Sequence, residues 1–185
     1  MREEQAEAIA REVLEALGAG RQIEPFSVRR PSFTTREAYA VTAALRRLRE
    51  EDGAASIGRK IGFTNRGIWA EYGVYEPIWG DVYDATASEI PPDAVIRVSH
   101  LPEPKIEPEI VFGLAEDIHP GMDERAILGA IAWVAHGFEI VQSVFPGWRF
   151  AVADCIAGAG MHGALFVGPR FPLRAAERDR LFEAL

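Results

Sequence analysis

The pattern of apolar residues changes near Gly53, and this change constrains the fold more than any other feature of the chain. Before that point, apolar residues recur at helical spacing, first over residues 6–17 and again over residues 38–48. After it, short apolar runs alternate with Gly and Pro, which is typical of β-strands. Helices followed mainly by strands predict an α+β fold, with residues 1–52 as the helical part and residues 53–185 as a mixed sheet.

Several helix boundaries are marked by their own signals. Gly18 and Gly20 end the first helix, and Thr34 with Glu37 three residues later forms a capping-box pattern at the start of the second. A short helix is predicted over residues 66–72 and a longer one over residues 123–136. Strands are predicted over residues 57–63, 77–83, 94–98, 106–114, 138–145 and 164–167.

The remaining segments indicate a single domain. Residues 153–164 are small and glycine-rich, which predicts a loop whose backbone amides contact a carboxylate or carbonyl. Residues 174–185 resemble the start of a further element. No internal repeat, low-complexity tract or linker divides the chain, so residues 1–185 are expected to form one domain.

Composition narrows the classes of function. The chain has 185 residues, is 48% hydrophobic and carries a formal charge of -8 with a pI near 5.1. This acidic balance argues against binding to nucleic acid or to an anionic membrane, because both require clustered Lys and Arg. Cys155 is the single cysteine, so no intrachain disulfide forms, and the N-terminus has no signal-peptide pattern. A cytoplasmic protein with a small-molecule substrate is expected.

Three glutamates stand inside stretches that otherwise resemble apolar strands: Glu107 and Glu109 in segment 104–112, and Glu139 in segment 137–143. An ionised carboxylate is unfavourable there unless a cation or hydrogen-bond donors compensate its charge. Because residues two apart on a strand share a face, the first two project together and a cation is expected between them. Three carboxylates suit a hard divalent ion, Mg²⁺ or Mn²⁺.

The alternative for these glutamates is that they face solvent from half-exposed strands, as acidic side chains usually do. The apolar neighbours Phe138 and Ile140 count against that alternative at Glu139. The residues by themselves leave both interpretations open.

Two further residues are candidates for chemistry. Lys60 lies in the glycine-flanked apolar segment 57–64, where it either transfers protons, orients an anionic substrate or simply extends into water. His162 lies in the glycine-rich segment and either contacts substrate, carries a proton or completes a turn. That segment lacks the pattern of a phosphate loop or a dinucleotide motif, so nucleotide binding is not expected.

The order and spacing of several motifs resemble the branch of the fumarylacetoacetate hydrolase superfamily that contains the 2-keto-4-pentenoate hydratases and the 4-oxalocrotonate decarboxylases. The leading helices, including residues 36–40, look similar as well. The resemblance rests on segments 60–64, 72–80, 104–112 and 137–141.

This resemblance implies N-terminal helices packed on a rolled, mixed β-sheet and a homo-oligomeric assembly. It implies the metal ligands Glu107, Glu109 and Glu139. In the hydratases the metal holds the substrate's 2-oxo or enol oxygen and its carboxylate, and water adds to the distal carbon after ketonisation. The expected activity is hydration of a small 2-hydroxydienoate or 2-oxo-enoate in aromatic catabolism, through a metal-stabilised enolate. The expected catalytic residue is Lys60, and the expected substrate-binding residues are Gly62, Thr64 and His162.

One departure from the family concerns proton transfer. Typical hydratases carry an acidic residue in a Pro-Asp-Phe/Tyr-Gly turn, where this chain has Ile78, a residue that cannot transfer a proton. Glu76, Asp81 and Asp84 lie close enough in sequence to replace it. Strand alternation, however, places Asp81 on the opposite face from position 78.

Other departures leave alternative activities open. His162 stands where the family has a small hydroxyl residue, and family members usually continue for several strands beyond the position of Leu185, so the chain is expected to be truncated. A 4-oxalocrotonate-type decarboxylase tolerates the loss of the acid at Ile78 better than a hydratase does. An acylpyruvate hydrolase usually needs a His-Glu arrangement, and segment 31–37 has a Glu but no His. A ligand-binding or oligomerising module without activity is the non-enzymatic alternative.

Overall fold

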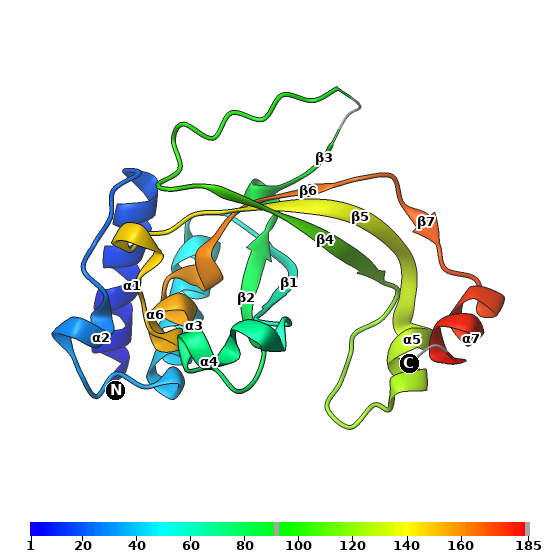
Figure 1. Ribbon diagram of the computed structural model, residues 1–185, viewed down its shortest axis with the longest axis horizontal. Coiled ribbons are helices and arrows are strands. Elements are labelled where there is room, and N and C mark those ends of the chain that lie inside the picture. Colours follow the sequence, from blue (N-terminus) through cyan, green and yellow to red (C-terminus); the bar gives the residue numbers. More distant parts are fainter. Residues whose placement is uncertain (91–92, 184–185) are drawn as a thin grey trace.

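The computed structural model describes residues 1–90 and 93–183 and has the predicted α+β character (Figure 1). Its α-helices are α1 (Glu3–Gly18), α2 (Phe26–Arg29), α3 (Thr35–Glu51), α4 (Trp69–Tyr72), α5 (Glu124–Ala130), α6 (Val152–Ala157) and α7 (Ala175–Glu183). Short 3₁₀ turns are η1 (Arg66–Ile68), η2 (Asp84–Thr86), η3 (Pro146–Trp148) and η4 (Ala159–Met161). The strands are β1 (Ser56–Gly62), β2 (Ile78–Tyr83), β3 (Ala87–Glu89), β4 (Lys105–Leu114), β5 (Ile131–Val141), β6 (His162–Val167) and β7 (Phe171–Pro172).

Helices α1, α3 and α6 form a helical group at one end of the molecule (Figure 1). The predicted capping box starts α3, because the Glu37 amide donates to Thr34 Oγ1 over 3.3 Å and the Thr34 amide donates to Glu37 Oε2 over 3.1 Å. Small side chains let α6 lie against α3, where Thr42 Oγ1 donates to the Ile156 carbonyl over 3.2 Å. One apolar core joins these helices to Ile78 of β2 and to Val141 of β5.

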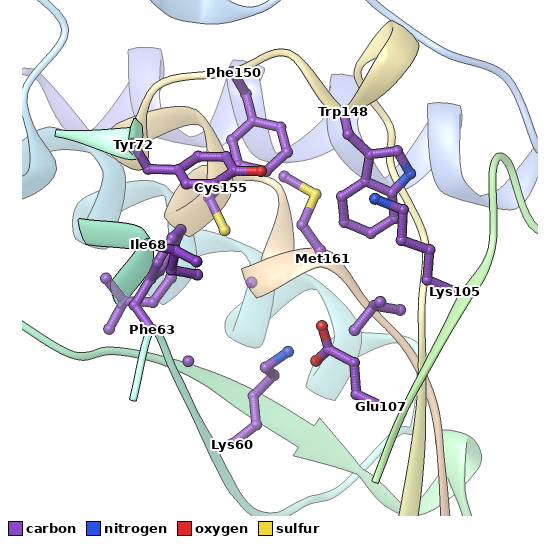
Figure 2. Close-up of a pocket in the computed structure, with 14 residues that line it drawn as sticks. Lys60, Phe63, Ile68, Tyr72, Lys105, Glu107, Trp148, Phe150, Cys155 and Met161 are labelled. Atoms are coloured by element: carbon purple, nitrogen blue, oxygen red, sulfur yellow. The ribbon is translucent and has the colours of Figure 1, made fainter. Parts of the chain in front are cut away.

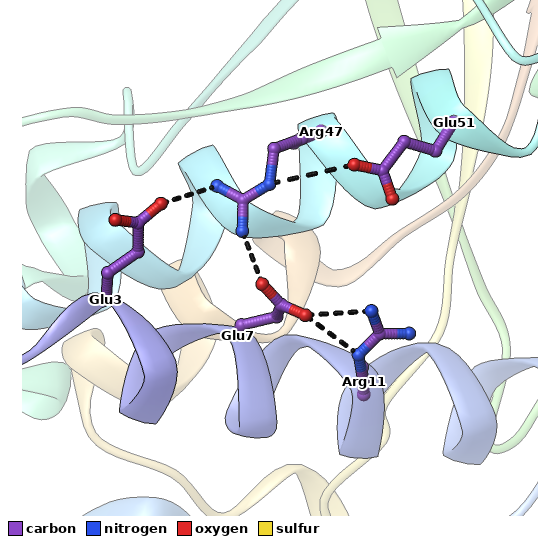
Figure 3. A network of polar contacts seen from close by, with 5 residues as sticks. All are labelled: Glu3, Glu7, Arg11, Arg47 and Glu51. Carbon is purple, nitrogen blue, oxygen red and sulfur yellow. Dashed lines mark hydrogen bonds and ion pairs between the residues drawn. The ribbon is translucent and has the colours of Figure 1, made fainter.

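An ion-pair network connects the exposed sides of α1 and α3 (Figure 3). Arg47 of α3 contacts Glu7 at 2.6 Å and Glu3 at 3.2 Å, both on α1, and also lies 3.9 Å from Glu51 on its own helix. Glu7 in turn accepts from Arg11 at 2.8 Å. Hydrogen bonds from Arg11 and Arg47 lower the pKa of Glu7. The network therefore favours this pairing of the two helices while leaving it sensitive to salt.

Two sheets extend from the helical group. Strands β1 and β2 form an antiparallel pair, and the larger sheet has the order β3-β6-β5-β4, with β7 also paired to β5. The larger sheet is mixed, because β3 runs parallel to β6 while the other pairs are antiparallel. Long strands β4 and β5 arch away from the helices toward α5 and α7 (Figure 1).

Three local predictions were wrong. Residues 94–98 form no strand, and the helix predicted over residues 123–136 ends at Ala130, where β5 begins. The aromatic and β-branched residues after Ala130 pair with β4 instead, so the sheet overrides the helical spacing. The third error is the glycine-rich loop predicted over residues 153–164, because most of α6 lies within it. The Ala151 amide caps the start of this helix by donating to Asp154 Oδ2 over 2.9 Å.

The C-terminal part agrees with the prediction of a new element after residue 174, since α7 covers Ala175–Glu183; the last two residues of that prediction lie outside the described residues. No helix in the described ranges is long and apolar enough to cross a membrane.

One face of β4 is apolar and exposed. Alternation along the strand places every second side chain on this face, away from the glutamates. Phe138 of β5 lies beside them on the same face, because it pairs with Pro108. We call this set the outer apolar face; its exposed large side chains are Ile106, Ile110, Phe112, Leu114 and Phe138.

Candidate metal centre and adjoining pocket

The structure brings the three glutamates together on the opposite face of the same strands. Glu107 pairs directly with Glu139 across the β4–β5 ladder, and Glu109 follows two residues later on the same face. One carboxylate oxygen of each residue lies within 4.8 Å of the others. Strand register, rather than loop conformation, therefore sets the geometry of this cluster.

Glu139 is the most buried member of the cluster, with 2% exposure. Its Oε2 atom accepts from Lys60 Nζ over 2.6 Å, and its Oε1 atom lies 2.7 Å from His162 Nδ1. Burial alone would raise the pKa of Glu139, but the hydrogen bond from His162 and the charge of Lys60 outweigh it and lower the pKa. Glu139 is thus an ionised carboxylate held at both oxygens.

Glu109 has the opposite electrostatic environment. Its partial burial, followed by repulsion from Glu139 and Glu107, raises the pKa of Glu109. A divalent cation between the three carboxylates would relieve that repulsion, and oxygen ligands are those that Mg²⁺ and Mn²⁺ prefer. A carboxylate has about four lone-pair positions, so Glu139 keeps acceptor capacity beyond its two present partners. The donor set fits a hard divalent ion.

Lys60 reaches Glu139 from the smaller sheet, where it pairs with Gly80 of β2. Two glycines lie beside its side chain, where an added Cβ atom would only reach van der Waals contact: one on Gly160 would lie 3.6 Å from Lys60 Cδ, and one on Gly80 would lie 3.6 Å from Lys60 Cγ. Its side chain is only 13% exposed. The ammonium group is therefore fixed between the glutamate cluster and the adjoining pocket.

The pocket is a cavity of about 170 Å³ between the helical group and the two sheets (Figure 2). Lys60 and Glu107 line one side, and Lys105 reaches in beside Trp148, whose ring centroid lies 4.0 Å from Lys105 Nζ. Most of the remaining wall is apolar or aromatic and comes from Gly62, Phe63, Ile68, Tyr72, Ile78, Val141, Phe150, Cys155, Gly160 and Met161. A cavity of this kind suits a small, flat acid with one charged end.

The residues predicted to bind substrate lie in three different places. Gly62 lines the pocket, whereas Thr64 is exposed and does not line it. His162 is 5% exposed and lies behind Glu139 instead of in the pocket wall. Sequence reasoning missed Trp148 and Lys105 in the pocket wall. It also missed Thr86, whose Oγ1 atom lies 2.8 Å from His162 Nε2. The aromatic cluster over residues 145–150 was the available signal for Trp148.

The pocket wall also contains the residue that departs from the family. Ile78 is 4% exposed and lines the cavity. None of the three nearby acidic residues takes its place: Asp81 contacts Ser56 Oγ at 3.2 Å, Asp84 accepts from the Ala55 amide at 2.9 Å, and Glu76 is exposed outside the pocket. The predicted orientation of Asp81 away from position 78 agrees with this arrangement.

Comparison with known proteins identifies relatives over most of the chain. It is 32% identical over 155 residues to a 2-hydroxyhexa-2,4-dienoate hydratase of Comamonas testosteroni, covering 83% of this chain and 59% of the relative. It is 30% identical over 170 residues to a 2-keto-4-pentenoate hydratase of Paraburkholderia xenovorans (strain LB400), covering 91% and 62% respectively. A 4-oxalocrotonate decarboxylase of a Pseudomonas species is 32% identical over 139 residues, which are 73% of this chain and 52% of that protein.

Solved structures give the same result. The 4-oxalocrotonate decarboxylase from Pseudomonas putida G7, complexed with magnesium and adipate, superposes with a TM-score of 0.85 at 28% identity, covering 91% of this chain and 64% of that one. The same enzyme complexed with calcium and acetate gives a TM-score of 0.81. No protein-family model matches the chain. The chain spans 59% and 62% of the length of the two hydratases. By sequence and by fold, the chain is similar to these hydratases and 4-oxalocrotonate decarboxylases, in agreement with the resemblance that its motifs indicate.

Proposed function

We propose that this protein is a divalent-metal-dependent hydratase, a lyase that adds water to a small 2-hydroxydienoate or 2-oxo-enoate in aromatic catabolism. The observation that carries the proposal is the cluster of Glu107, Glu109 and Glu139 beside Lys60 at the edge of an apolar cavity. The hydratases among its relatives support the assignment. The substrate would be a small 2-oxo acid or its enol.

The three glutamates would hold Mg²⁺ or Mn²⁺. When bound, the ion would stabilise negative charge on the substrate's oxygens as a Lewis acid. The protein's own groups would do the remainder: Lys60 would hold the acidic end of the substrate and move a proton, and Gly62 would let the substrate approach the backbone. Thr64 stays a proposed substrate contact. Phe63, Tyr72 and the other aromatic walls would pack against the apolar conjugated chain of the substrate.

The test of the hydratase combines metal binding with dienoate absorbance. Glu107→Gln should abolish Mn²⁺ binding in calorimetry, and both Glu107→Gln and Lys60→Met should reduce the metal-dependent loss of dienoate absorbance by at least about 100-fold. Glu116→Gln, an exposed residue just after β4, is the matched control and should behave as wild type. Mn²⁺ binding that persists unchanged in Glu107→Gln would remove the metal site from the proposal.

Ile78 favours one alternative, a 4-oxalocrotonate-type decarboxylase. Loss of carbon dioxide requires chiefly an electron sink, and the apolar wall at Ile78 offers no acid for hydration. Carbon dioxide release from 4-oxalocrotonate, measured beside dienoate hydration, separates the two. If the protein is a decarboxylase, Ile78→Asp should lower carbon dioxide release and leave hydration undetectable; if it is a hydratase, Ile78→Asp should raise hydration.

Two other activities have less support. For an acylpyruvate hydrolase, the glutamate of segment 31–37 would need to reach substrate, but Glu37 is used in the capping box and lies 3.4 Å from the N-terminal amine. A ligand-binding module without activity would bind Mn²⁺ and a 2-oxo acid while turning over neither substrate. The two assays above identify that outcome directly.

We also propose the wider setting that the family resemblance implies. The protein would act in the cytoplasm, and residues 1–185 would form one domain whose helical part (1–52) packs on a mixed sheet (53–185). That sheet would be rolled, and the two hydratases that the chain matches are longer than the chain itself.

Self-association is part of this proposal, and the outer apolar face supports it. Monomeric proteins rarely expose contiguous apolar patches of more than a few hundred Å², and Ile106, Ile110 and Phe112 are each about half exposed on one strand face. Ile110→Glu should lower the mass measured by light scattering, whereas Val28→Glu, at an exposed position of α2, should not. An unchanged mass in Ile110→Glu would exclude this face as the contact.

A further inference from the structure

We propose that His162 is a positioning residue of the metal centre: its Nδ1–H group holds Glu139 in the orientation that binds the divalent ion, and Thr86 holds the imidazole ring in place. This inference rests on the metal site of the proposed function. It assigns His162 a different role from the substrate contact that the sequence predicts.

Both ring nitrogens of His162 are already used inside the protein. Nδ1 lies 2.7 Å from Glu139 Oε1, and Nε2 lies 2.8 Å from Thr86 Oγ1. The ring is buried and does not line the pocket. Because an ionised carboxylate only accepts hydrogen bonds, Nδ1 carries the proton and donates to Glu139. The side chain therefore has no free polar atom to offer a substrate.

The backbone places His162 at this point. The three residues before it, Ala159, Gly160 and Met161, all have a left-handed backbone, with φ values of 60°, 62° and 61°. This turn reverses the chain between α6 and β6, and β6 then begins at His162 opposite Val141, two residues after Glu139 on β5. Two of these three residues carry a Cβ atom. Their left-handed backbone therefore raises the conformational free energy of the turn, and the surrounding contacts must offset that increase.

Thr86 is anchored in turn. Its Oγ1 hydroxyl donates to the Tyr83 carbonyl oxygen over 3.1 Å, across the η2 turn. The contact chain therefore runs from the backbone at the end of β2, through Thr86 and His162, to Glu139. It connects the smaller sheet to the metal centre by a second route, in addition to Lys60.

The consequence for the metal lies in how Glu139 is fixed. Lys60 holds one oxygen and His162 the other, so the plane of the carboxylate is set and its remaining lone pairs point in fixed directions. Without His162, the carboxylate would be free to rotate about the Lys60 contact. Loss of such an outer hydrogen bond typically weakens metal affinity by about 10- to 100-fold.

The experiment measures Mn²⁺ affinity by calorimetry, with Mn²⁺ as the only probe, on the full chain. His162→Ala should weaken binding by about 10- to 100-fold, and His162→Asn, which keeps an N–H donor at the Nδ1 position, should restore most of it. Thr86→Val, which frees the ring but keeps the donor, should cause a smaller loss. His136→Ala removes an exposed histidine of the same strand as Glu139 and is the matched control, with no expected loss.

The outcomes separate this inference from the proposed function. If wild type binds no Mn²⁺, or Glu107→Gln binds as wild type does, the metal site itself fails. If binding depends on Glu107 but His162→Ala and Thr86→Val both match wild type, the positioning role is wrong and the metal site stands. If His162→Ala fails to fold, the other two variants decide. A loss of Mn²⁺ affinity in Thr86→Val that is at least as large as the loss in His162→Asn supports the positioning role. A larger loss in His162→Asn than in Thr86→Val contradicts it.

Discussion

At the scale of single residues, Cys155 is a buried thiol in the pocket wall. Burial raises the pKa of Cys155 to about 12, so the reactive thiolate is scarce at neutral pH. At pH 8 the native protein should react with a thiol reagent at least ~10³-fold more slowly than the protein in urea, because an unfolded cysteine has a pKa of about 8.5. Fast reaction of the native protein would mean that this wall of the pocket opens readily.

The same thiol gives stability a pH dependence. The pKa of Cys155 is higher in the native protein than in the unfolded chain. The contribution of this thiol to the free energy of unfolding is therefore complete below pH ~8.5, and it is lost as the pH rises toward the native pKa. Above pH ~8.5 the free energy of unfolding should fall by up to about 1.4 kcal/mol per pH unit from this group alone. Urea titrations of wild type and Cys155→Ala isolate the effect, since the variant should lack this part of the slope.

Gly113 shows a residue whose importance depends on a neighbour across the sheet. A Cβ atom on Gly113 would overlap the indole ring of Trp133, its partner on β5. Gly113→Ala should therefore destabilise the protein by about 1–3 kcal/mol, measured by chemical unfolding. Gly129→Ala in α5 is the control, because a Cβ atom added there would have nothing within 4 Å, and alanine should be neutral or slightly stabilising at that position.

At the scale of elements, the α1–α3 ion pairs should make the helix pair sensitive to acid. Because Arg11 and Arg47 lower the pKa of Glu7, the stabilisation is present above the unfolded pKa of Glu7 and is lost as pH falls through the native value. Arg47→Met should shift the pKa of Glu7 upward in NMR titrations and move acid unfolding to higher pH. High salt should reduce the difference between the two proteins.

The elements also show which features the sequence makes predictable. Local signals were sufficient to predict α3. The Thr34 capping box and the apolar residues at helical spacing after it depend only on residues of that segment. Residues 131–136 were not predictable in this way, because their conformation is decided by pairing with β4, which is distant in sequence. The alternation that placed Glu107 and Glu109 on one face was local, whereas their register against Glu139 was not.

The role of His162 illustrates the same limit within the site. Its residue type and its glycine-rich surroundings are compatible with a substrate contact, a proton carrier or a turn. Only the three-dimensional arrangement places Thr86 and Glu139 on either side of the ring. Thr86 itself carried no sequence signal, because an isolated threonine between two strands is common.

At the scale of the whole molecule, a metal between β4 and β5 would stabilise the sheet as well as the site. A ligand that binds only the folded state stabilises it by about 2.7 kcal/mol at 100 times its dissociation constant. For a chain of this size, Mn²⁺ should then raise the melting temperature by about 5–10 °C. An equal rise in Glu107→Gln would show that Mn²⁺ acts somewhere other than the proposed site.

The distribution of basic residues has a further consequence. Lys60 and Lys105 are the only lysines in the sequence, all other strongly basic residues being arginines, and both line the pocket. Amine-selective labelling should therefore modify only the pocket and the N-terminal amine. Mass spectrometry of peptides carrying Lys60 and Lys105 would then report occupancy of the cavity without a turnover assay, and a 2-oxo acid that binds there should protect both from the label.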